Sequence, residues 1–257
     1  MHDALAGQRL ARSDFRVPRY ATVDLSGRTV REVVPRGKHM LLRIEASDTP
    51  PLTVHTHFRM DGSWHLYRPG QRWRRPGHQA RLVLDTATRQ AVGFSLHDIR
   101  VIRTSEEHRL VGHLGPDLLG DDWDPAIALA NLTAQPDAEI GLALLDQRNL
   151  AGLGNLYRTE VLFLHEITPW TRVGDVDDLP DLLTRAHDLL LRNRDDWPQV
   201  TTGDPRRGRQ HWIFERAGRP CHRCGTLVRS ARQGGEPQDR ITYWCPRCQQ
   251  GPVPPGQ

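Results

Sequence analysis

The chain has 257 residues and a net charge of +4, with 37% of its residues hydrophobic and 26% charged. This composition fits a soluble globular protein, and the length suggests one large domain or two modest ones. No apolar run approaches the roughly 18 residues of a membrane span. The first residues lack the basic-then-apolar layout of a signal peptide, so we expect a cytoplasmic protein.

Residues 20–110 are predicted to form mainly strands. The segments are short, often alternate between polar and apolar residues, and are separated by Gly, Pro, Asp or Ser turns. They span 29–34, 39–46, 52–60, 63–68, 80–86 and 91–96. This pattern is typical of a β-sandwich or barrel.

Lys38 stands out within the first of these turns, in the stretch VVPRGKHML (33–41). It is the single lysine among 35 basic residues, and the others are all arginine. A site that needs a compact amine able to lose its proton cannot use arginine, whereas an ordinary surface charge can. Lys38 is therefore a candidate active-site amine, and the alternative is a chance survivor on a solvated turn.

The segment HTHFRMDGSW (55–64) carries a strand into an Asp-Gly turn. Met60, with Arg59 beside it, could act as a wedge between nucleic-acid bases, or could simply fill the edge of the core. His55 and His57 share a strand face and could bind a metal, but the sequence indicates no third ligand.

From Asp124 the pattern becomes helical. Asp124 is predicted as an N-cap with Pro125 at the first helical position. Helices are expected over 126–134, 140–147 and 155–167, and an apolar stripe from Leu182 to Leu190 indicates a further one. The glycine-rich turn RNLAGLGN leads into a helix at Asn155, which favours an anion site there, although a plain turn between two packed helices fits equally well.

Four cysteines near the C-terminus follow the pattern C-x2-C-x20-C-x2-C, at positions 221, 224, 245 and 248. Four thiolates on two knuckles satisfy tetrahedral Zn²⁺ and leave no open position, so we expect a structural zinc site rather than a redox pair. The spacer fits a hairpin that carries Arg229, Arg232 and Arg240. Residues 201–257 have a net charge of +6, which favours a nucleic-acid partner, although an arginine-rich chain is also basic without one.

Several motifs occur in a specific order: RGKHML, HTHFRMDGSW, HLGPDLL, QRNLAGLGNLYRTE and a ribbon that ends in YWCPRCQ. Together they resemble the formamidopyrimidine-DNA glycosylase/endonuclease VIII family of base-excision repair enzymes, from about Leu5 to Gln249, and the bacterial endonuclease VIII-like branch in particular. The resemblance implies an α+β fold. Its expected parts are a β-sandwich over 1–118, a helix–two-turn–helix domain over 124–210 and a zinc ribbon over 213–249, and we expect a disordered tail over 250–257.

The resemblance also implies roles for single residues. Lys38 matches the family's hairpin lysine near the scissile phosphates, and Met60 matches the wedge that fills the space of the flipped-out nucleotide; Arg59 is expected beside it at the DNA. Asn155 and Arg240 match residues that grip the phosphates flanking the lesion. Arg100 in HDIRVIR matches the arginine that faces the orphaned base, although Ile102 stands where the family has an aromatic residue.

The N-terminus departs from the family pattern. The family begins Met-Pro-Glu, and its proline amine attacks the sugar C1′ to form an imine while the glutamate assists proton transfer. This chain begins MHDALAGQ, where Gly7 resembles the C-terminal cap of a helix. Either the recorded start is an internal codon of a complete enzyme, or the chain is shortened and lacks this nucleophile.

Three functions follow. The favoured one is a DNA glycosylase and abasic-site lyase that acts on oxidised bases, with damaged double-stranded or abasic DNA as partner, as a nucleoid-associated monomer. The alternative is a catalytically inactive protein that binds damaged or abasic DNA. A zinc-ribbon regulator that reads DNA sequence would explain the basic end but not the RGKH motif. All three predict salt-sensitive DNA binding, because phosphate contacts release counterions.

Overall fold

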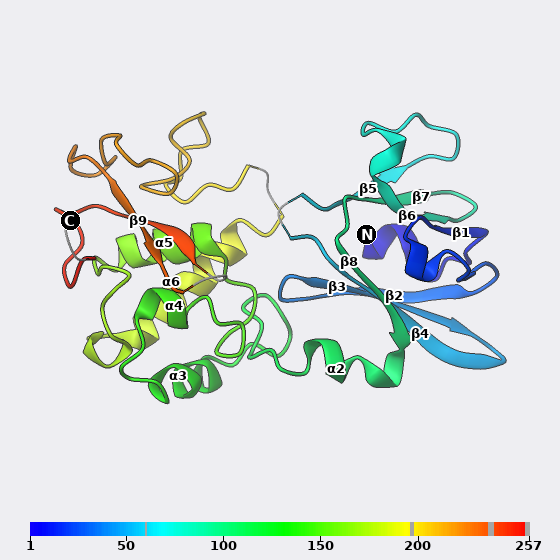
Figure 1. Ribbon diagram of the computed structural model, residues 1–257, viewed down its shortest axis with the longest axis horizontal. Coiled ribbons are helices and arrows are strands. Elements are labelled where there is room, and N and C mark those ends of the chain that lie inside the picture. Colours follow the sequence, from blue (N-terminus) through cyan, green and yellow to red (C-terminus); the bar gives the residue numbers. More distant parts are fainter. Residues whose placement is uncertain (60, 196–197, 236–238, 255–257) are drawn as a thin grey trace. The chain divides into compact units, whose positions relative to one another are not determined.

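The computed structural model describes residues 1–59, 61–195, 198–235 and 239–254. It divides into two compact units, Met1–His113 and Leu114–Gln257, which are coloured blue to green and green to red in Figure 1. Each unit has its own hydrophobic core. None of the helices among the described residues is both long and apolar enough to cross a bilayer.

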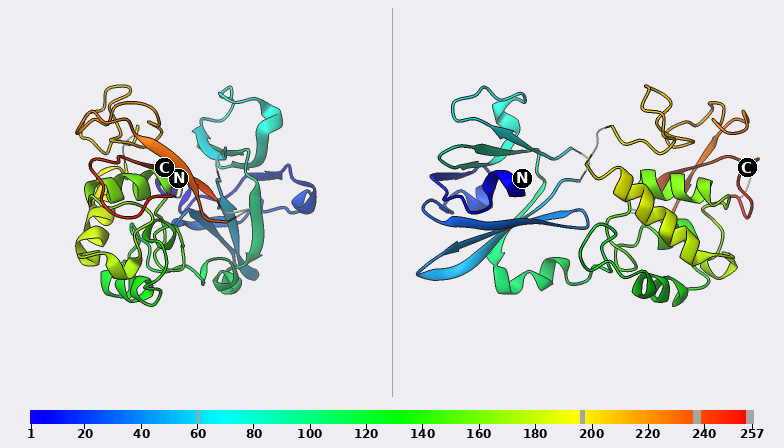
Figure 2. Two further views of the ribbon diagram at one scale, coloured as in Figure 1. Left: turned by 60° about the vertical axis from the view of Figure 1, so that its left-hand side comes forward. Right: turned by 180° about the vertical axis from the view of Figure 1, so that it is seen from behind.

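The first unit is a sandwich of two antiparallel four-stranded sheets (Figure 1 and Figure 2). One sheet has the order β1-β6-β7-β5, with bounds Arg12–Phe15, Ala80–Asp85, Gln90–Phe94 and Ser63–Tyr67. The other has the order β2-β3-β4-β8, with bounds Thr29–Arg36, His39–Ala46, Thr49–His57 and Asp98–Arg103. The predicted sandwich is confirmed.

Alternation along the strands builds the core between these sheets. In β3 the side chains of Met40, Leu42 and Ile44 are buried in one cluster, while His39 and Arg43 lie on the opposite face. Because side chains of a strand alternate between faces, this register leaves one polar face on the β2-β3-β4-β8 sheet. The candidate residues of this unit lie on that face or in the turns at its end.

A short helix, α1 (His2–Leu5), packs against β2, and Leu5 is fully buried in the sandwich core. Gly7 follows with a φ of 74°, the left-handed conformation expected of a residue just past a helix end. The remaining helical pieces of this unit are short. They are η1 (Pro18–Tyr20), η2 (Gly77–Gln79), η3 (Thr104–Glu106) and α2 (His108–Val111).

The second unit consists of helices and one hairpin. Its elements are α3 (Pro125–Thr133), α4 (Ile140–Ala143), α5 (Asn155–Leu164), η4 (Val173–Asp175), α6 (Leu179–Arg192), β9 (Arg229–Gln233) and β10 (Arg240–Trp244). Asp124 caps α3 as predicted, because its Oδ1 accepts the backbone N–H groups of Ala126 at 2.8 Å and Ile127 at 3.3 Å.

The helix predicted over 140–147 is shorter than expected and ends at Ala143. Residues 146–148 form a turn instead of a further helical turn, in which the Asp146 Oδ1 accepts the backbone N–H of Arg148 at 3.0 Å. The helix that starts at Asn155 ends at Leu164, and Glu166 then adopts a φ of 62°. Residues 165–167 are therefore not helical.

Helix α5 borders two hydrophobic clusters. One side, including Val161 and Leu162, packs into the helical core with the buried stripe of α6. Phe163 instead joins Ile213 and the first and third cysteines in the core of the ribbon. The tail from Gln250 was expected to be disordered, but the backbone N–H of Gln250 donates to the Glu166 carbonyl at 2.7 Å; residues 255–257 lie outside the described part of the chain.

Candidate nucleic-acid interface and metal centre

The four cysteines of the ribbon converge on one point. Their Sγ atoms all lie within 4.8 Å of one another, and the Sγ atoms of Cys224 and Cys245 are 3.4 Å apart. Tetrahedral zinc with Zn–S bonds of about 2.3 Å places its sulfurs roughly 3.8 Å apart, so the spacing suits such an ion. The backbone N–H of Arg223 points at the Cys221 Sγ at 3.4 Å, which is compatible with a thiolate. Cys221, Cys224, Cys245 and Cys248 are thus positioned to bind a metal ion.

Glu160 of α5 anchors the segment that leads into the ribbon. It is fully buried, and its carboxylate accepts the backbone N–H groups of Trp212 at 2.7 Å, Ile213 at 3.0 Å and Phe214 at 2.9 Å. The Thr201 hydroxyl donates to the same carboxylate. Because three successive N–H groups and one hydroxyl converge on the carboxylate, these donors satisfy its oxygens inside the fold.

Asn155 is the first residue of α5, and Gly154 before it provides no side-chain cap. The first N–H groups of a helix have no intrahelical partner and carry the positive end of the dipole, so this terminus suits an anion. The Asn155 Nδ2 donates to the carbonyl of Ile241 in β10 at 2.9 Å. The residue predicted in the glycine-rich turn thus touches the ribbon hairpin.

Arg158, one turn further along α5, is fully buried. Its Nη1 donates to the Gln233 Oε1 at 2.7 Å, and its Nη2 donates to the Thr242 Oγ1 at 2.7 Å and to the Asn155 Oδ1. Burial lowers the pKa of this guanidinium to about 10, with Arg240 adding to the effect, so it remains charged at neutral pH. The side chain therefore joins α5 to both strands of the hairpin.

Arg240 opens strand β10 and is exposed. Its Nη1 donates to the Asp239 carbonyl at 2.9 Å, and its backbone pairs with Gln233 across the hairpin. Arg232, one of the other two hairpin arginines, forms an ion pair with the Asp239 side chain. Asn155 bonds the carbonyl of Ile241, the residue that follows Arg240 in β10, so the structure brings these two predicted residues together.

Lys38 lies in the two-residue turn between β2 and β3, where Arg36 pairs with His39. Gly37 has a φ of 57°, which suits the first position of a type II′ hairpin turn and requires glycine. Lys38 itself is exposed. The rigid turn thus carries the only lysine of the chain at the end of a two-strand arm.

Three histidines surround the base of this turn. His39 pairs with His57 across β3 and β4, and the His39 Nδ1 lies 2.7 Å from the His55 Nε2. Burial, reinforced by the neighbouring histidines, lowers the pKa of His39 to about 4, and burial also lowers the pKa of His55 and of His57. His39 is the third histidine that the sequence pattern did not indicate, because only strand pairing brings it to the other two. Among the described residues, only the four cysteines form a group with metal-binding geometry.

The other candidates of the first unit lie close to this cluster. Arg59 is exposed with a φ of 53°, and its backbone N–H donates to the His57 Nδ1 at 3.2 Å. Arg100 is exposed on β8, where it pairs with His55, and its Nε lies 3.3 Å from the Asp98 Oδ1. Met60 lies outside the described residues. Lys38, Arg59 and Arg100 therefore gather around one end of the polar sheet face.

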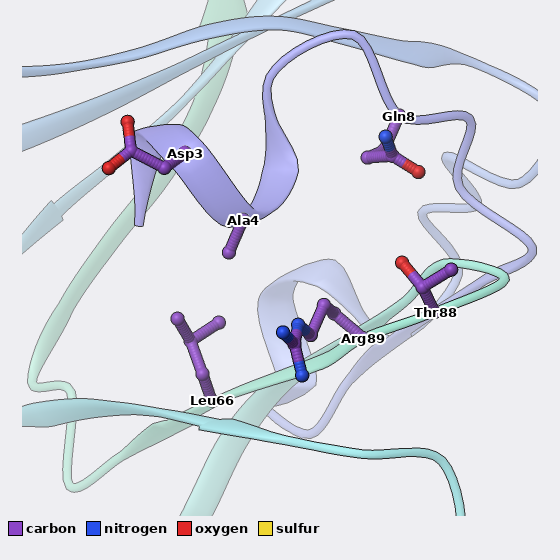
Figure 3. Close-up of a pocket in the computed structure, with 6 residues that line it drawn as sticks. All are labelled: Asp3, Ala4, Gln8, Leu66, Thr88 and Arg89. Atoms are coloured by element: carbon purple, nitrogen blue, oxygen red, sulfur yellow. The ribbon is translucent and has the colours of Figure 1, made fainter.

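A separate hollow opens beside α1 (Figure 3). Figure 3 shows Leu66 and Arg89 across the hollow from the Ala4 side chain. Its lining residues are Asp3, Ala4, Gln8, Leu66, Thr88 and Arg89. None of the candidate residues that the structure describes lines this hollow, so we do not assign it to the site.

Arg158 and Glu160 are buried charged residues of this region that the sequence patterns did not single out. Both belong to the quoted motif QRNLAGLGNLYRTE, but a helix pattern places charged residues on a solvated face. One sequence signal could have indicated their burial. Apolar residues lie on more than one side of this helix, so charged residues between them can also be buried.

Known proteins share the sequence and the fold. A family model described as the formamidopyrimidine-DNA glycosylase N-terminal domain matches residues 2–105, and one described as the H2TH domain of that glycosylase matches residues 114–179. A probable endonuclease 8 2 from Streptomyces coelicolor is 58% identical over 99% of this chain and 91% of its own length. A protein from Mycolicibacterium smegmatis named DNA-(apurinic or apyrimidinic site) lyase Nei2 is 47% identical over 96% of this chain and 92% of its own length.

The fold resembles that of the Lactococcus lactis Fpg, solved in complex with DNA that contains an abasic site. The TM-score is 0.77 at 22% identity, over 97% of this chain and 95% of that one. With two family models along the chain and relatives well above 30% identity, the chain belongs to the formamidopyrimidine-DNA glycosylase/endonuclease VIII family.

Proposed function

We propose that this protein is a base-excision repair DNA glycosylase with abasic-site lyase activity, acting on oxidised bases. Family membership along nearly the whole chain carries the proposal, together with a relative at 47% identity that is named an abasic-site lyase. Nothing in the comparisons supports the alternative of a catalytically inactive binding protein.

The chemistry of such an enzyme requires an amine. The amine attacks C1′ of the damaged nucleotide and displaces the base, which leaves with a proton, and the sugar ring then opens to an imine as O4′ becomes a hydroxyl. At a site that is already abasic, the amine condenses with the C1′ aldehyde and water is lost instead. Removal of a proton from C2′ then breaks the C3′–O bond and nicks the strand. The family resemblance assigns this attack to an N-terminal proline amine and not to Lys38, which is the only lysine of the chain and lies on a rigid turn. The role of Lys38 in the proposal is to engage the phosphate beside the scissile bond as a compact cation.

DNA binding in this proposal uses both units. Asn155 and Arg240 grip the phosphates next to the lesion, which their position at a helix N-terminus and on an exposed strand supports. Arg59 and Arg100 are proposed to contact DNA from the first unit, and Met60 is proposed as the wedge that replaces the flipped nucleotide. The Lactococcus lactis protein, solved with abasic-site DNA, supports this choice of partner.

Zinc is the metal proposed for the four-cysteine site. An all-thiolate set of four with no other ligand position suits Zn²⁺ in a structural role. Bound there, the ion would stabilise the ribbon that carries Arg240, and it would take no part in the bond-breaking steps. We also propose that the protein is a monomer and is located in the cytoplasm, in association with the nucleoid.

Borohydride trapping tests this function directly. The protein is incubated with a duplex that holds one abasic site or one oxidised pyrimidine, and borohydride is added to reduce any imine to a stable amine link. We expect a covalent protein–DNA adduct together with strand nicking, and peptide mass spectrometry then identifies the amine. The matched control is a tetrahydrofuran abasic analogue, which has no aldehyde and so gives no adduct. Absence of both adduct and nicking with the abasic and oxidised duplexes would disprove the proposed function.

A further inference from the structure

The amide of Asn155 raises a question of orientation. An asparagine amide has an oxygen that only accepts and a nitrogen that carries two N–H donors. Turned one way it attracts a phosphate oxygen, and turned the other way it repels one. A residue that grips phosphate therefore needs its amide fixed in one of two orientations that have nearly the same shape.

The neighbours of Asn155 select one orientation. The group on one side is the Arg158 guanidinium, which has no acceptor, so the atom facing it must be Oδ1. The group on the other side is the Ile241 carbonyl, which has no donor, so the atom facing it must be Nδ2, at 2.9 Å. Since Nδ2 has two N–H groups, the one not used by Ile241 is set to donate to a phosphate oxygen.

Arg158 is held by a chain of hydrogen bonds that ends on a carboxylate. Its Nη1 donates to the Gln233 Oε1, and the Gln233 Nε2 donates to the Glu139 Oε2 at 2.8 Å and to the Pro169 carbonyl at 2.8 Å. The Gln233 amide is thereby fixed as well, with its oxygen toward Arg158. The Gln233 amide thus links the buried Arg158 guanidinium to the Glu139 carboxylate through two hydrogen bonds.

This arrangement is a poor way to stabilise a fold. The Arg158 Nε is buried and has no hydrogen-bond partner among the described residues, and a buried cation with an unmade hydrogen bond costs stability. A helix position filled only for packing would hold an apolar side chain. The guanidinium also bonds Thr242, two residues from Arg240, so it joins the two phosphate-gripping residues.

Resting on the proposed function, we infer that Arg158 is a positioning residue: it fixes the Asn155 amide with an N–H outward and locks α5 to β10, so that Asn155 and Arg240 bind the DNA backbone as one preset unit. Removing Arg158 frees the amide to turn, and Asn155 then contributes to DNA binding no better than alanine.

A double-mutant cycle tests this inference. The variants are Arg158→Met, Arg158→Lys, Asn155→Ala and the two combinations, and the probe is a duplex with one tetrahydrofuran abasic analogue, followed by fluorescence anisotropy. We expect Arg158→Met and Asn155→Ala each to weaken binding by about tenfold, which corresponds to the loss of roughly one hydrogen bond. The double variant should be no weaker than either single one. Lysine, which keeps the charge without the planar fork, should restore part of the affinity.

Thr184→Val is the matched control, because it removes a threonine hydroxyl from an exposed position of α6, where the hydroxyl donates to the Pro180 carbonyl at 2.9 Å and none of the Arg158 contacts is involved; we expect its affinity within about threefold of wild type. The salt dependence adds a second readout. Loss of Asn155 removes no cation and leaves the slope of log Kd against log salt unchanged, whereas Arg240→Ala lowers it by about 0.9.

Additive losses in the Arg158 and Asn155 combinations, including those with Arg158→Lys should Arg158→Met fail to fold, would overturn the inference. They would show that Arg158 supports the fold independently of Asn155. If the wild-type protein instead binds the abasic analogue no more tightly than undamaged duplex, the proposed function fails. The two failures are therefore distinguishable.

Discussion

Replacement of Glu160 by glutamine changes one oxygen for an NH₂ group inside the second unit. The fully buried carboxylate accepts three backbone N–H groups and the Thr201 hydroxyl. Glutamine keeps one acceptor oxygen, which can still serve Ile213 and Phe214. The NH₂ group would then face the N–H of Trp212, donor against donor, while the Thr201 hydroxyl can still donate to the Gln210 carbonyl at 3.1 Å.

The cost of Glu160→Gln follows from this count. One buried N–H loses its acceptor, at about 1–3 kcal/mol, and two more bonds lose their charge-assisted strength, at about 1 kcal/mol each. We therefore expect the free energy of unfolding to fall by about 4 kcal/mol. In urea this is a shift of the midpoint by roughly 1–4 M for the transition of this unit. Tryptophan fluorescence, with Trp212 next to the changed group, reports the transition.

The control for this change is Glu166→Gln. The Glu166 side chain is 64% exposed and forms an ion pair with Arg223, so its loss should cost less than about 1 kcal/mol. A Glu160→Gln midpoint indistinguishable from that of Glu166→Gln would refute the reasoning, because it would mean that the converging N–H groups do not depend on a carboxylate.

Three further predictions concern the amine, the histidines and the metal. Lys38→Arg keeps the charge but not the compact ammonium, so we expect at least tenfold slower nicking of abasic DNA with little change in its Kd; equal nicking rates would exclude a special role for the amine. The folded-state pKa of His39, about 4, lies below its ordinary 6.5, so protonation favours the unfolded state, and stability should decline by up to about 3 kcal/mol as pH falls from 6.5 to 4; His39→Gln should flatten this decline in urea midpoints. Cys245→Ala should abolish the expected single bound metal, measured by mass spectrometry, and should weaken DNA binding, whereas Ser105→Ala should do neither.

The sequence patterns predicted the sandwich and most of its strands, because apolar residues recur on one face of most strands. Strand β3 spans the predicted residues 39–46, where an apolar run with Met40, Leu42 and Ile44 on the core face lies between two turns. Strand β1 was not predicted, because RSDF holds three polar residues and one apolar residue, Phe15, which is too short a run to show a period. Strand β8 was noted only as a motif. The shortening of α4 depends on a side-chain turn at Asp146, which a count of apolar residues does not register.

The sequence predicted those parts of the candidate site that depend on short motifs. It did not predict the parts that depend on contacts between residues far apart in the chain. The cysteine spacing, the Gly-Lys turn and the Asn155 terminus are all short-range signals. The contacts of Arg158 join residues 75 and 84 positions apart, and the His39–His55 contact depends on the register of two strands. A buried arginine and an exposed one look alike in a sequence, so the role of Arg158 needed the structure.

The charged residues of α5 that face the ribbon also affect the solubility of this unit when the ribbon is not docked. The helical core around Val161 is built within residues 118–190, while the ribbon docks through more distant contacts and would gain stability from the proposed metal. If the ribbon and the segment leading into it were detached, the surface uncovered on α5 would include Arg158 and Glu160 beside Phe163. Water can solvate these charges, so the partly unfolded protein exposes a hydrated surface and not a large apolar one. Redocking of the ribbon can therefore compete with aggregation.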